Sequence, residues 1–344
     1  MKRLGPTRRP GNGGTVELSG IFRSYAGQFA TQSFFHSLFS ALLAELAVKA
    51  WRIRDPVNRQ RILFLAIVLP VVSFPLYQWI NPARSSALFR MGALFDSTGW
   101  LGLEPFGAVR VGTLLLLVFL LTSLTFVFQE LFPVVRHGLV RKRSIPVRDA
   151  FEDPRVASLL EPLPLSDVDV HLFEEEDPLI FSSTGRNGSI YLSTGLLDAL
   201  EGEQVRAAVA HEYAHVVRGR KPLIILMFLL RSVLFFNPLV LLEFRRIVQE
   251  DEKICDDVAV RLTGRSSALA SVLRRMYLEG KDPGVPEGDS RGRSLEELEM
   301  YSQKLHIESR IRRLERSPPP PDEAVWLAGL AAVAAALAIN YFVV

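Results

Sequence analysis

The sequence contains little cysteine and little histidine, with one cysteine, Cys255, and six histidines among 344 residues. A single cysteine excludes an internal disulfide, which fits a working domain in a reducing compartment that faces the cytosol. No internal repeat is visible. The first residues, MKRLGPTRRPGNGG, have no apolar core close behind their basic side chains. They predict a flexible basic tail, residues 1–31, and not a secretory signal.

Net charge is also small, because 40 lysines and arginines face 37 aspartates and glutamates, which gives a formal charge of +3. The cations come in knots beside apolar runs, for example at residues 141–143 and 218–221. Such knots are typical of the cytoplasmic flanks of membrane segments, where lysine and arginine set the orientation. We therefore expect an integral protein of the cell (inner) membrane, in contact with lipid and without a nucleic-acid partner.

Hydrophobic residues make up 49% of the chain and are clustered. Three runs have the length and composition of membrane spans, at residues 62–80, 111–128 and 324–344. The first two would form a hairpin with residues 81–110 as its outer loop. These two spans and the helix before them make up an N-terminal membrane region, residues 32–135, and the last run is a C-terminal transmembrane helix.

Residues 33–50 leave two alternatives open. Small and polar side chains such as Ser33 and Ser37 fall on one helical face, and large apolar ones such as Leu42 and Leu46 fall on the other. This pattern is typical of a helix that lies in the membrane interface. A further span is the rival interpretation. Basic residues on both sides favour the interfacial one, because a crossing helix would carry one basic group outside.

A polar domain, residues 136–316, follows the membrane region, and a Pro-rich spacer, residues 317–323, separates it from the last span. Within this domain, residues 167–173 alternate like a strand and residues 179–194 predict two short strands around a turn. The strand at residues 189–193 could pair with an extended substrate by edge addition. The predicted fold class is a mainly α membrane protein with a cytosolic α+β domain that contains a small β-sheet.

The pentapeptide HEYAH, residues 211–215, lies in a segment predicted to be a helix that ends near Gly219. On a helix, His211 and His215 are i and i+4, so both imidazoles project from one face and can hold Zn²⁺. Glu212 adjoins the first histidine and can act as general base toward a zinc-bound water. The alternative is a surface helix with two solvated histidines. Apolar residues around the motif predict a buried helix instead, in which paired histidines need partners.

Zinc requires a third protein ligand, and the acidic segment EDEKICDDVAV, residues 250–260, offers candidates. Glu252 and Asp256 are i and i+4 on a predicted helix. Glu252 could coordinate the metal, and Asp256 could accept the second N–H of a ligand histidine. The spacing alone does not distinguish this pair from an acidic face exposed to solvent.

Several motifs resemble those of integral-membrane gluzincin peptidases. SIYLSTGLLDALEGEQVRAAVAHEYAHVVRGR is similar to both the HtpX and CAAX-prenyl-protease type and the BlaR/MecR sensor-transducer type. HIESRIRRL, residues 306–314, resembles the H-x-x-x-R-I-x-x-L pattern of the first type. FFNPLV, residues 235–240, followed by EKICD, resembles the second type. The cysteine before the aspartate and the short gap from His215 to Glu252 look most like the BlaR/MecR branch.

The resemblance implies a zinc metalloendopeptidase with one Zn²⁺ per chain and a protein or peptide substrate. By resemblance the ligands would be His211, His215 and Glu252, and Glu212 would be the base. Asp256 would orient a ligand histidine by accepting the hydrogen bond of its second ring nitrogen.

By the same resemblance, His306 or Arg310 would stabilise the oxyanion, although either could simply brace its helix. BlaR/MecR-type transducers carry an extracellular penicillin-binding domain after the last span. No such domain follows in this sequence, so we do not expect β-lactam sensing.

Residues 222–242 are apolar enough for another span, but a single crossing would put Glu252 and His211 on opposite sides of the membrane. Arg231 in the middle of this segment is costly in lipid, and the Asn-Pro pair at residues 237–238 breaks the helix. We therefore predict a re-entrant or interfacial helical hairpin that places the active site at the cytosolic membrane surface. A buried helix in a soluble core is the alternative.

Three functional hypotheses follow. The first is a membrane-anchored zinc endopeptidase with a regulatory, signal-transducing role, such as cleavage of a cytosolic repressor. The second is an HtpX-type quality-control protease that clears damaged membrane proteins. The third is a non-catalytic membrane scaffold that retains the fold, which the intact motif disfavours because a scaffold has no need of Glu212. Cys255 is predicted to be a packing residue and not a nucleophile.

Overall fold

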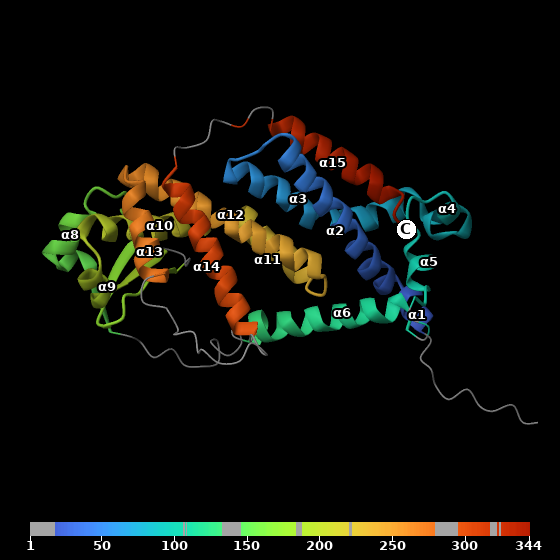
Figure 1. The fold of residues 1–344 in the computed structure, drawn as a ribbon, viewed down its shortest axis with the longest axis horizontal. Coiled ribbons are helices and arrows are strands. Elements are labelled where there is room, and N and C mark those ends of the chain that lie inside the picture. The colour runs from blue at the N-terminus through green and yellow to red at the C-terminus, as the bar shows by residue number, and fades with distance from the viewer. Residues whose placement is uncertain are drawn as a thin grey trace, which may run out of the picture.

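The computed structural model describes residues 18–105, 107, 109–132, 146–183, 188–219, 222–278, 295–316, 322 and 325–344. Several predicted features lie wholly or largely outside these residues, namely the start of the basic tail, the basic knot at 141–143, the turn between the strands of 179–194 and the 317–323 spacer. The described chain forms a bundle of long helices and, beside it, a smaller part that holds the β-sheet (Figure 1).

The bundle consists mainly of long apolar helices. They are α1 (Leu18–Arg23), α2 (Tyr25–Ala50), α3 (Pro56–Ile80), α6 (Val111–Phe126) with a π-helical continuation (Val127–Leu131), and α15 (Val325–Tyr341). Short helices connect α3 to α6: η1 (Pro82–Ser85), α4 (Ala87–Met91) and α5 (Ser97–Leu101).

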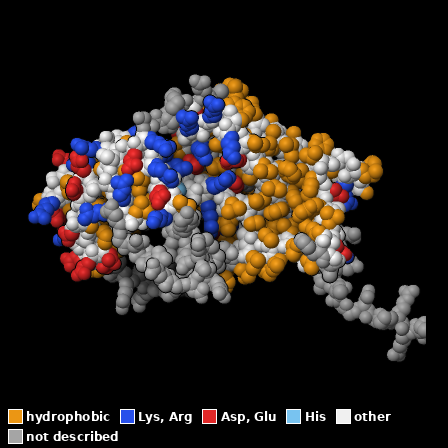
Figure 2. Space-filling view, in the orientation of Figure 1, with side chains coloured by type: hydrophobic (Ala, Val, Ile, Leu, Met, Phe, Trp, Pro, Cys, Tyr) orange, Lys and Arg blue, Asp and Glu red, His pale blue; other side chains and the backbone are white. Residues whose placement is uncertain are grey.

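Three helical segments, α2, α3 and Val111–Leu131, are long and apolar enough to cross a membrane, whereas α15 is apolar but only 17 residues long. Hydrophobic side chains cover most of the visible surface of the helical bundle, and charged side chains gather over the part that holds the sheet (Figure 2). These observations confirm the predicted mainly helical membrane fold.

The first membrane helix differs from the prediction in extent and in orientation. Residues 18–31, predicted to be tail, form α1 and the beginning of α2. The small and polar face of α2 points inward: Ser33 and Ser37 are at most 2% exposed, whereas Leu42 and Leu46 are 53% and 60% exposed. An interfacial helix turns its polar face to water, so the interfacial alternative is not supported. The length of α2 fits the spanning alternative.

Polar side chains of α2 bond to other parts of the bundle. The Asn237 amide donates to Ser37 Oγ at 2.9 Å, and the Asn340 amide donates to Ser40 Oγ at 3.1 Å. Because a bilayer offers no water to buried polar groups, such groups need partners inside the protein. The polar face of α2 is therefore a contact surface within the bundle, although its sequence pattern looks like that of a surface helix.

The smaller part contains a four-stranded sheet in the order β1-β2-β4-β3. Its strands are β1 (Val147–Asp149), β2 (Asp169–Phe173), β3 (Ile180–Ser183) and β4 (Ser189–Ser193). β2 and β4 pair in parallel, and the other two pairs are antiparallel. Around the sheet lie η3 (Ala150–Glu152), α8 (Pro154–Leu160), α9 (Thr194–Ala199), α10 (Gly202–Gly219), α13 (Ser266–Tyr277) and α14 (Leu295–Leu314).

Alternation along the strands fixes which face of the sheet is buried. Leu172 of β2 and Ile190 and Leu192 of β4 enter a core that they share with α10. The predicted small sheet is thus confirmed. The prediction that residues 189–193 offer an edge to substrate is wrong, because β4 is paired on both sides. The edges belong to β1 and β3.

The apolar segment after the motif helix reverses direction and returns. It forms two helices, α11 (Pro222–Val233) and α12 (Pro238–Thr263). Asn237 caps α12 by accepting a hydrogen bond from the Leu239 amide at 3.1 Å, and Pro238 occupies the first helical turn. The rings of Phe228 and Phe244 lie 5.1 Å apart across the two helices. The predicted break at residues 237–238 is confirmed, and a single straight crossing is excluded.

The hairpin formed by α11 and α12 pairs its buried charge and leaves large apolar side chains exposed. Arg231 is 1% exposed and pairs with Glu130 at 2.9 Å, which supplies the partner that a charge in lipid needs. Ile225, Phe228 and Leu229 are between 54% and 59% exposed. A helix in a soluble core would bury these side chains, so that alternative is not supported.

Arg84 holds the C-terminal end of α15. It is fully buried, and its guanidinium donates to the carbonyls of Asn340 and Tyr341 at 2.7 and 2.8 Å and to that of Val343. A further bond at 2.8 Å reaches Gln32 of α2. Carbonyls at a helix C-terminus have no partner within the helix, so this side chain satisfies groups that the bilayer could not.

Replacing Arg84 by methionine should therefore destabilise the bundle by about 3 kcal/mol or more, because several buried carbonyls lose their donor. The matched variant Arg110→Met removes only an exposed ion pair with Glu104 and should cost less than about 1 kcal/mol. Thermal unfolding of both variants in the same detergent measures the difference. Equal midpoints would mean that Arg84 does not hold α15.

Candidate metal centre

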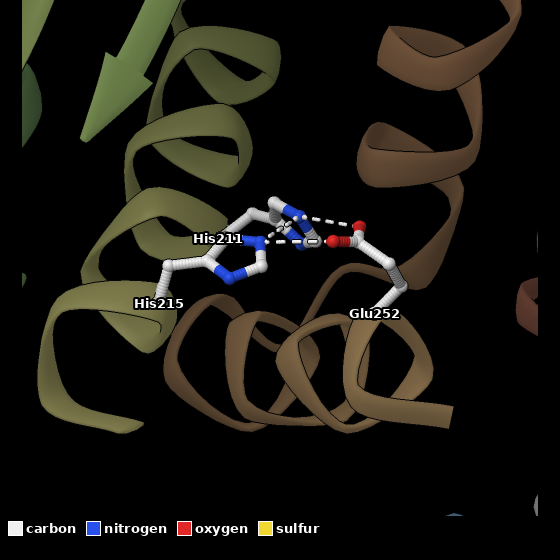
Figure 3. Close-up of side chains that lie close together, drawn as sticks. All are labelled: His211, His215 and Glu252. Carbon is white, nitrogen blue, oxygen red and sulfur yellow. Dashed lines mark hydrogen bonds and ion pairs between the residues drawn. The ribbon is translucent and has the colours of Figure 1, made fainter. Parts of the chain in front are cut away.

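α10 carries the HEYAH motif and presents both histidines on one face. The opposite face, which includes Val209 and Val216, is buried in the core under the sheet and fixes the rotation of the helix. His211 and His215 therefore face α12, and their Nε2 atoms lie 3.2 Å apart. Both rings point toward Glu252 (Figure 3).

α12 supplies the third group of the site. Glu252 places Oε2 at 3.5 Å from His211 Nε2 and Oε1 at 3.4 Å from His215 Nε2. With the contact between the histidines, the three side chains form a triangle in which each pair is 3.2 to 3.5 Å apart at its contacting atoms. Tetrahedral Zn²⁺ with ligand bonds of about 2.0–2.1 Å needs ligand atoms about 3.3 Å apart. The donor set and its spacing therefore fit zinc.

Asp256 and Arg310 brace this triangle from behind. Asp256 is 1% exposed, and its Oδ1 lies 3.1 Å from His211 Nδ1. Arg310 of α14 donates to both Asp256 oxygens at 2.8 and 2.6 Å and pairs with Glu252 Oε2 at 2.9 Å. A carboxylate at Nδ1 keeps the proton of the imidazole there and leaves Nε2 for a metal. The bidentate pair with Arg310 holds that carboxylate in place.

The charges of His211, Glu252, Asp256 and Arg310 stabilise one another. Burial alone would lower the pKa of His211, but hydrogen bonds to Asp256 and Glu252 outweigh it and raise this pKa to about 9. Burial acts to raise the pKa of Glu252, whereas His211 and Arg310 lower it to about 2. Against the same effect of burial, Arg310 and His211 hold the pKa of Asp256 well below its usual range. Both carboxylates are therefore ionised at neutral pH and can complement a cation.

His215 has a different neighbour at its second nitrogen. Cys255 Sγ lies 3.5 Å from His215 Nδ1, and Cys255 is fully buried. Burial raises the pKa of the Cys255 thiol, and Asp251 and Glu252 raise it further, so the thiol stays protonated. Asp251 joins His215 and Cys255 in a group whose ligand-type atoms all lie within 4.8 Å of one another. Asp251 is one of the acidic candidates that residues 250–260 offer, but the sequence does not predict its place beside His215 and Cys255.

Three further polar residues lie near the site. Glu212 makes no hydrogen bond or ion pair within the described part of the chain. Burial raises the pKa of Tyr277, at the end of α13, and the charges of Arg310, Glu212 and Glu252 also act on it. Burial and Arg310 lower the pKa of His306, whose Nε2 is buried without a hydrogen-bond partner among the described residues. The sequence predicts a role for His306 but gives no signal for Tyr277.

Known proteins resemble this chain in the region of the site. The model of the BlaR1 peptidase M56 family matches residues 108–269, a stretch that contains α10 and Glu252 but not α14. The protease HtpX homolog of Sulfurovum sp. (strain NBC37-1) is 22% identical over an alignment that covers 42% of this chain and 68% of the relative. The predicted resemblance to BlaR/MecR-like and HtpX-type membrane metallopeptidases is confirmed. A peptidase of this kind implies a metal ion and a peptide or protein substrate.

Replacing His211 or Glu252 by alanine should remove most of the bound zinc, because each change opens the triangle. Elemental analysis of detergent-purified, remetallated protein should find about one zinc per chain in the wild type. His171→Ala and Asp257→Ala, which remove a histidine of the sheet and an acidic neighbour paired with Arg313, should keep it. Full zinc content in Glu252→Ala would place the third ligand elsewhere.

Proposed function

We propose that the chain is a membrane-anchored zinc endopeptidase that hydrolyses peptide bonds at the cytosolic face of the membrane and has a regulatory role. The triangle of His211, His215 and Glu252, with Glu212 beside it, is the observation that carries this proposal. Three protein ligands leave a fourth position for water or substrate, which is typical of catalytic zinc sites. A purely structural site would be closed by a fourth protein ligand.

Hydrolysis would be shared between the metal and the residues around it. Zn²⁺, when bound, would polarise the scissile carbonyl and lower the pKa of a water molecule. Glu212 has no competing ion pair among the described residues, so its carboxylate is free to take the proton of the attacking water and pass it to the leaving amine. Asp256 and Arg310 would keep His211 and Glu252 oriented while this happens.

Negative charge develops on the carbonyl oxygen in the transition state and needs a hydrogen-bond donor. Arg310 is poorly suited, because its Nε and both Nη atoms already contact Asp256 and Glu252. We therefore assign it the bracing role. His306 has a buried Nε2 without a partner among the described residues. Tyr277 is protonated at neutral pH like any phenol, and burial raises its pKa further. These two side chains are the candidate donors.

The edge of the sheet nearest the motif helix suggests how substrate is held. β3 contacts α10 and is an edge strand, so an extended peptide could extend the sheet by pairing with it. Phe181 of β3 is 45% exposed and stacks on Tyr191 at a centroid distance of 5.0 Å. An aromatic surface of this kind would contact alternate side chains of the substrate.

The cytosolic orientation is supported by the placement of charge. The turn between α2 and α3 carries the exposed cations Arg52 and Arg54, and Arg61 is exposed near the start of α3, at the end of the bundle next to the peptidase part. Lysine and arginine accumulate on the cytoplasmic side of membrane helices. The thiol of Cys255 in its buried setting also fits a reducing compartment.

The comparisons support two biological roles. The match to the BlaR1 peptidase family favours a regulatory protease, and the similarity to an HtpX homolog favours quality control. A comparison of the proteomes of wild-type and Glu212→Gln strains distinguishes them. Accumulation of one or a few proteins would support the regulatory role, and broad accumulation of damaged membrane proteins would support quality control. An unchanged proteome would favour the scaffold hypothesis.

Glu212→Gln should lower the rate of peptide hydrolysis by about 10²–10⁴-fold, the usual contribution of a general base. Zinc content should stay at the wild-type value, because Glu212 is not part of the ligand triangle. Hydrolysis of casein and elemental analysis on the same preparations measure both quantities. A variant that hydrolyses casein at the wild-type rate would assign the base to another group.

One of the two variants His306→Ala and Tyr277→Phe should remove the oxyanion donor. That variant should lower kcat by about 10²–10³-fold, while KM and zinc content change little. The other variant should keep kcat within about threefold of the wild type. Tyr25→Phe, at the exposed start of α2, is the matched control and should resemble the wild type. Wild-type kcat in both test variants would rule out both donors.

A further inference from the structure

Gln60 connects the membrane bundle to the helices of the metal site. It lies near the N-terminal end of α3, and its side chain is 2% exposed. The amide nitrogen donates to Asp251 Oδ1 at 3.1 Å, and the amide oxygen accepts from Arg218 Nη2 at 3.1 Å. Both partners belong to the helices that carry the metal ligands, α12 and α10.

Arg218 and Asp251 themselves join the two ligand-bearing helices. Arg218 Nε donates to Asp251 Oδ1 at 3.0 Å, and Nη2 contacts the same oxygen. Arg218 follows His215 by three residues, and Asp251 directly precedes Glu252. This pair therefore fixes α10 against α12 within one turn of two of the three ligands.

Asp251 also lies close to a ligand. Its carboxylate oxygen is within 4.8 Å of a ring nitrogen of His215 and of Cys255 Sγ, so it lies on the side of His215 that faces away from the triangle. A second contact from α3 reaches the same turn, where Arg59 pairs with Glu250 at 3.2 Å. The end of α3 thus contacts the two residues that precede Glu252.

A glutamine at position 60 suits its two charged neighbours, Arg218 and Asp251. A glutamine amide has both a donor and an acceptor, so it can satisfy a carboxylate and a guanidinium at once. An apolar side chain would leave both buried groups without this partner, which costs free energy. A glutamate would place a like charge beside Asp251.

We propose that Gln60 is a positioning residue for the metal site, through which the membrane bundle sets the distance between the ligand helices α10 and α12. This inference rests on the proposed zinc peptidase function. The bundle is then part of the catalytic apparatus as well as its anchor. Any movement of α3 would change the ligand triangle through Arg218 and Asp251.

The test uses the full-length protein in detergent and compares Gln60→Leu with the wild type. Loss of the amide should speed the release of zinc to a chelator on the order of tenfold, the lower end of what outer partners of metal ligands contribute. The visible absorption bands of the Co²⁺-substituted protein should shift, because Glu252 or His215 changes position. Turnover of casein should show a lower kcat with KM within about twofold of the wild type.

Two further variants complete the comparison. Arg61→Gln is the matched control, since Arg61 is the next residue of α3 and is exposed. It should behave like the wild type in all three measurements. Gln60→Glu keeps an acceptor for Arg218 but loses the donor to Asp251, and it should change zinc release in the same direction as Gln60→Leu.

The outcomes separate this inference from the proposed function. Wild-type protein that takes up neither zinc nor cobalt would overturn the proposed function, and this inference with it. Wild type that binds metal, together with unchanged zinc release and cobalt spectra in Gln60→Leu, would overturn the inference alone. A lower unfolding temperature without these changes would give Gln60 a purely structural role.

Discussion

The contact between His211 and Glu252 constrains the path of the chain between them. Their side chains meet at 3.5 Å, although an apolar segment separates them in sequence. That segment cannot cross a membrane once, because its two ends must reach the same site. The chain reverses at Asn237, which caps α12 and bonds to Ser37 of α2 at the tip of the hairpin. The capping residue of one helix is thus also the anchor of the hairpin in the bundle.

Buried polar side chains organise the rest of the bundle in the same way. Each is costly in an apolar environment unless it is paired, so each fixes one element at a defined place. Arg84 fixes the end of α15, Arg231 fixes α6 through Glu130, and Gln60 fixes the helices of the metal site. Apolar contacts between helices in lipid allow many relative orientations of the helices, whereas each of these hydrogen-bonded pairs requires a defined one.

The parts of the site that depend on local spacing could be predicted from the sequence. The i and i+4 positions of His211 and His215 follow from helical geometry, and the break at Asn237 follows from its capping chemistry and the following proline. The return of Glu252 to α10 could be predicted because a zinc site needs a third ligand.

The features that were missed or wrongly predicted depend on contacts between distant segments. The polar face of α2 has the same pattern whether it meets water or Asn340. β4 could not be recognised as a central strand, since its second neighbour, β2, pairs with it in parallel and not through a tight turn. Tyr277 approaches the site only because α13 packs against α10. Periodicity describes one element at a time and contains no information about which partner covers its face.

The charges around the site explain why two arginines accompany the acidic residues. Three carboxylates and two guanidinium groups lie near the ligand histidines: Asp251, Glu252, Asp256, Arg218 and Arg310. Carboxylates at such short distances would raise one another's pKa if they stood alone. The arginines keep these carboxylates ionised. Their planar guanidinium groups also fix the orientation of the carboxylates, which the ammonium group of a lysine could not do. Glu212 is a fourth carboxylate near the site, without an ion pair among the described residues, so the negative charges exceed the positive ones. This excess favours a cation in the triangle, either a proton on His211 or a divalent metal.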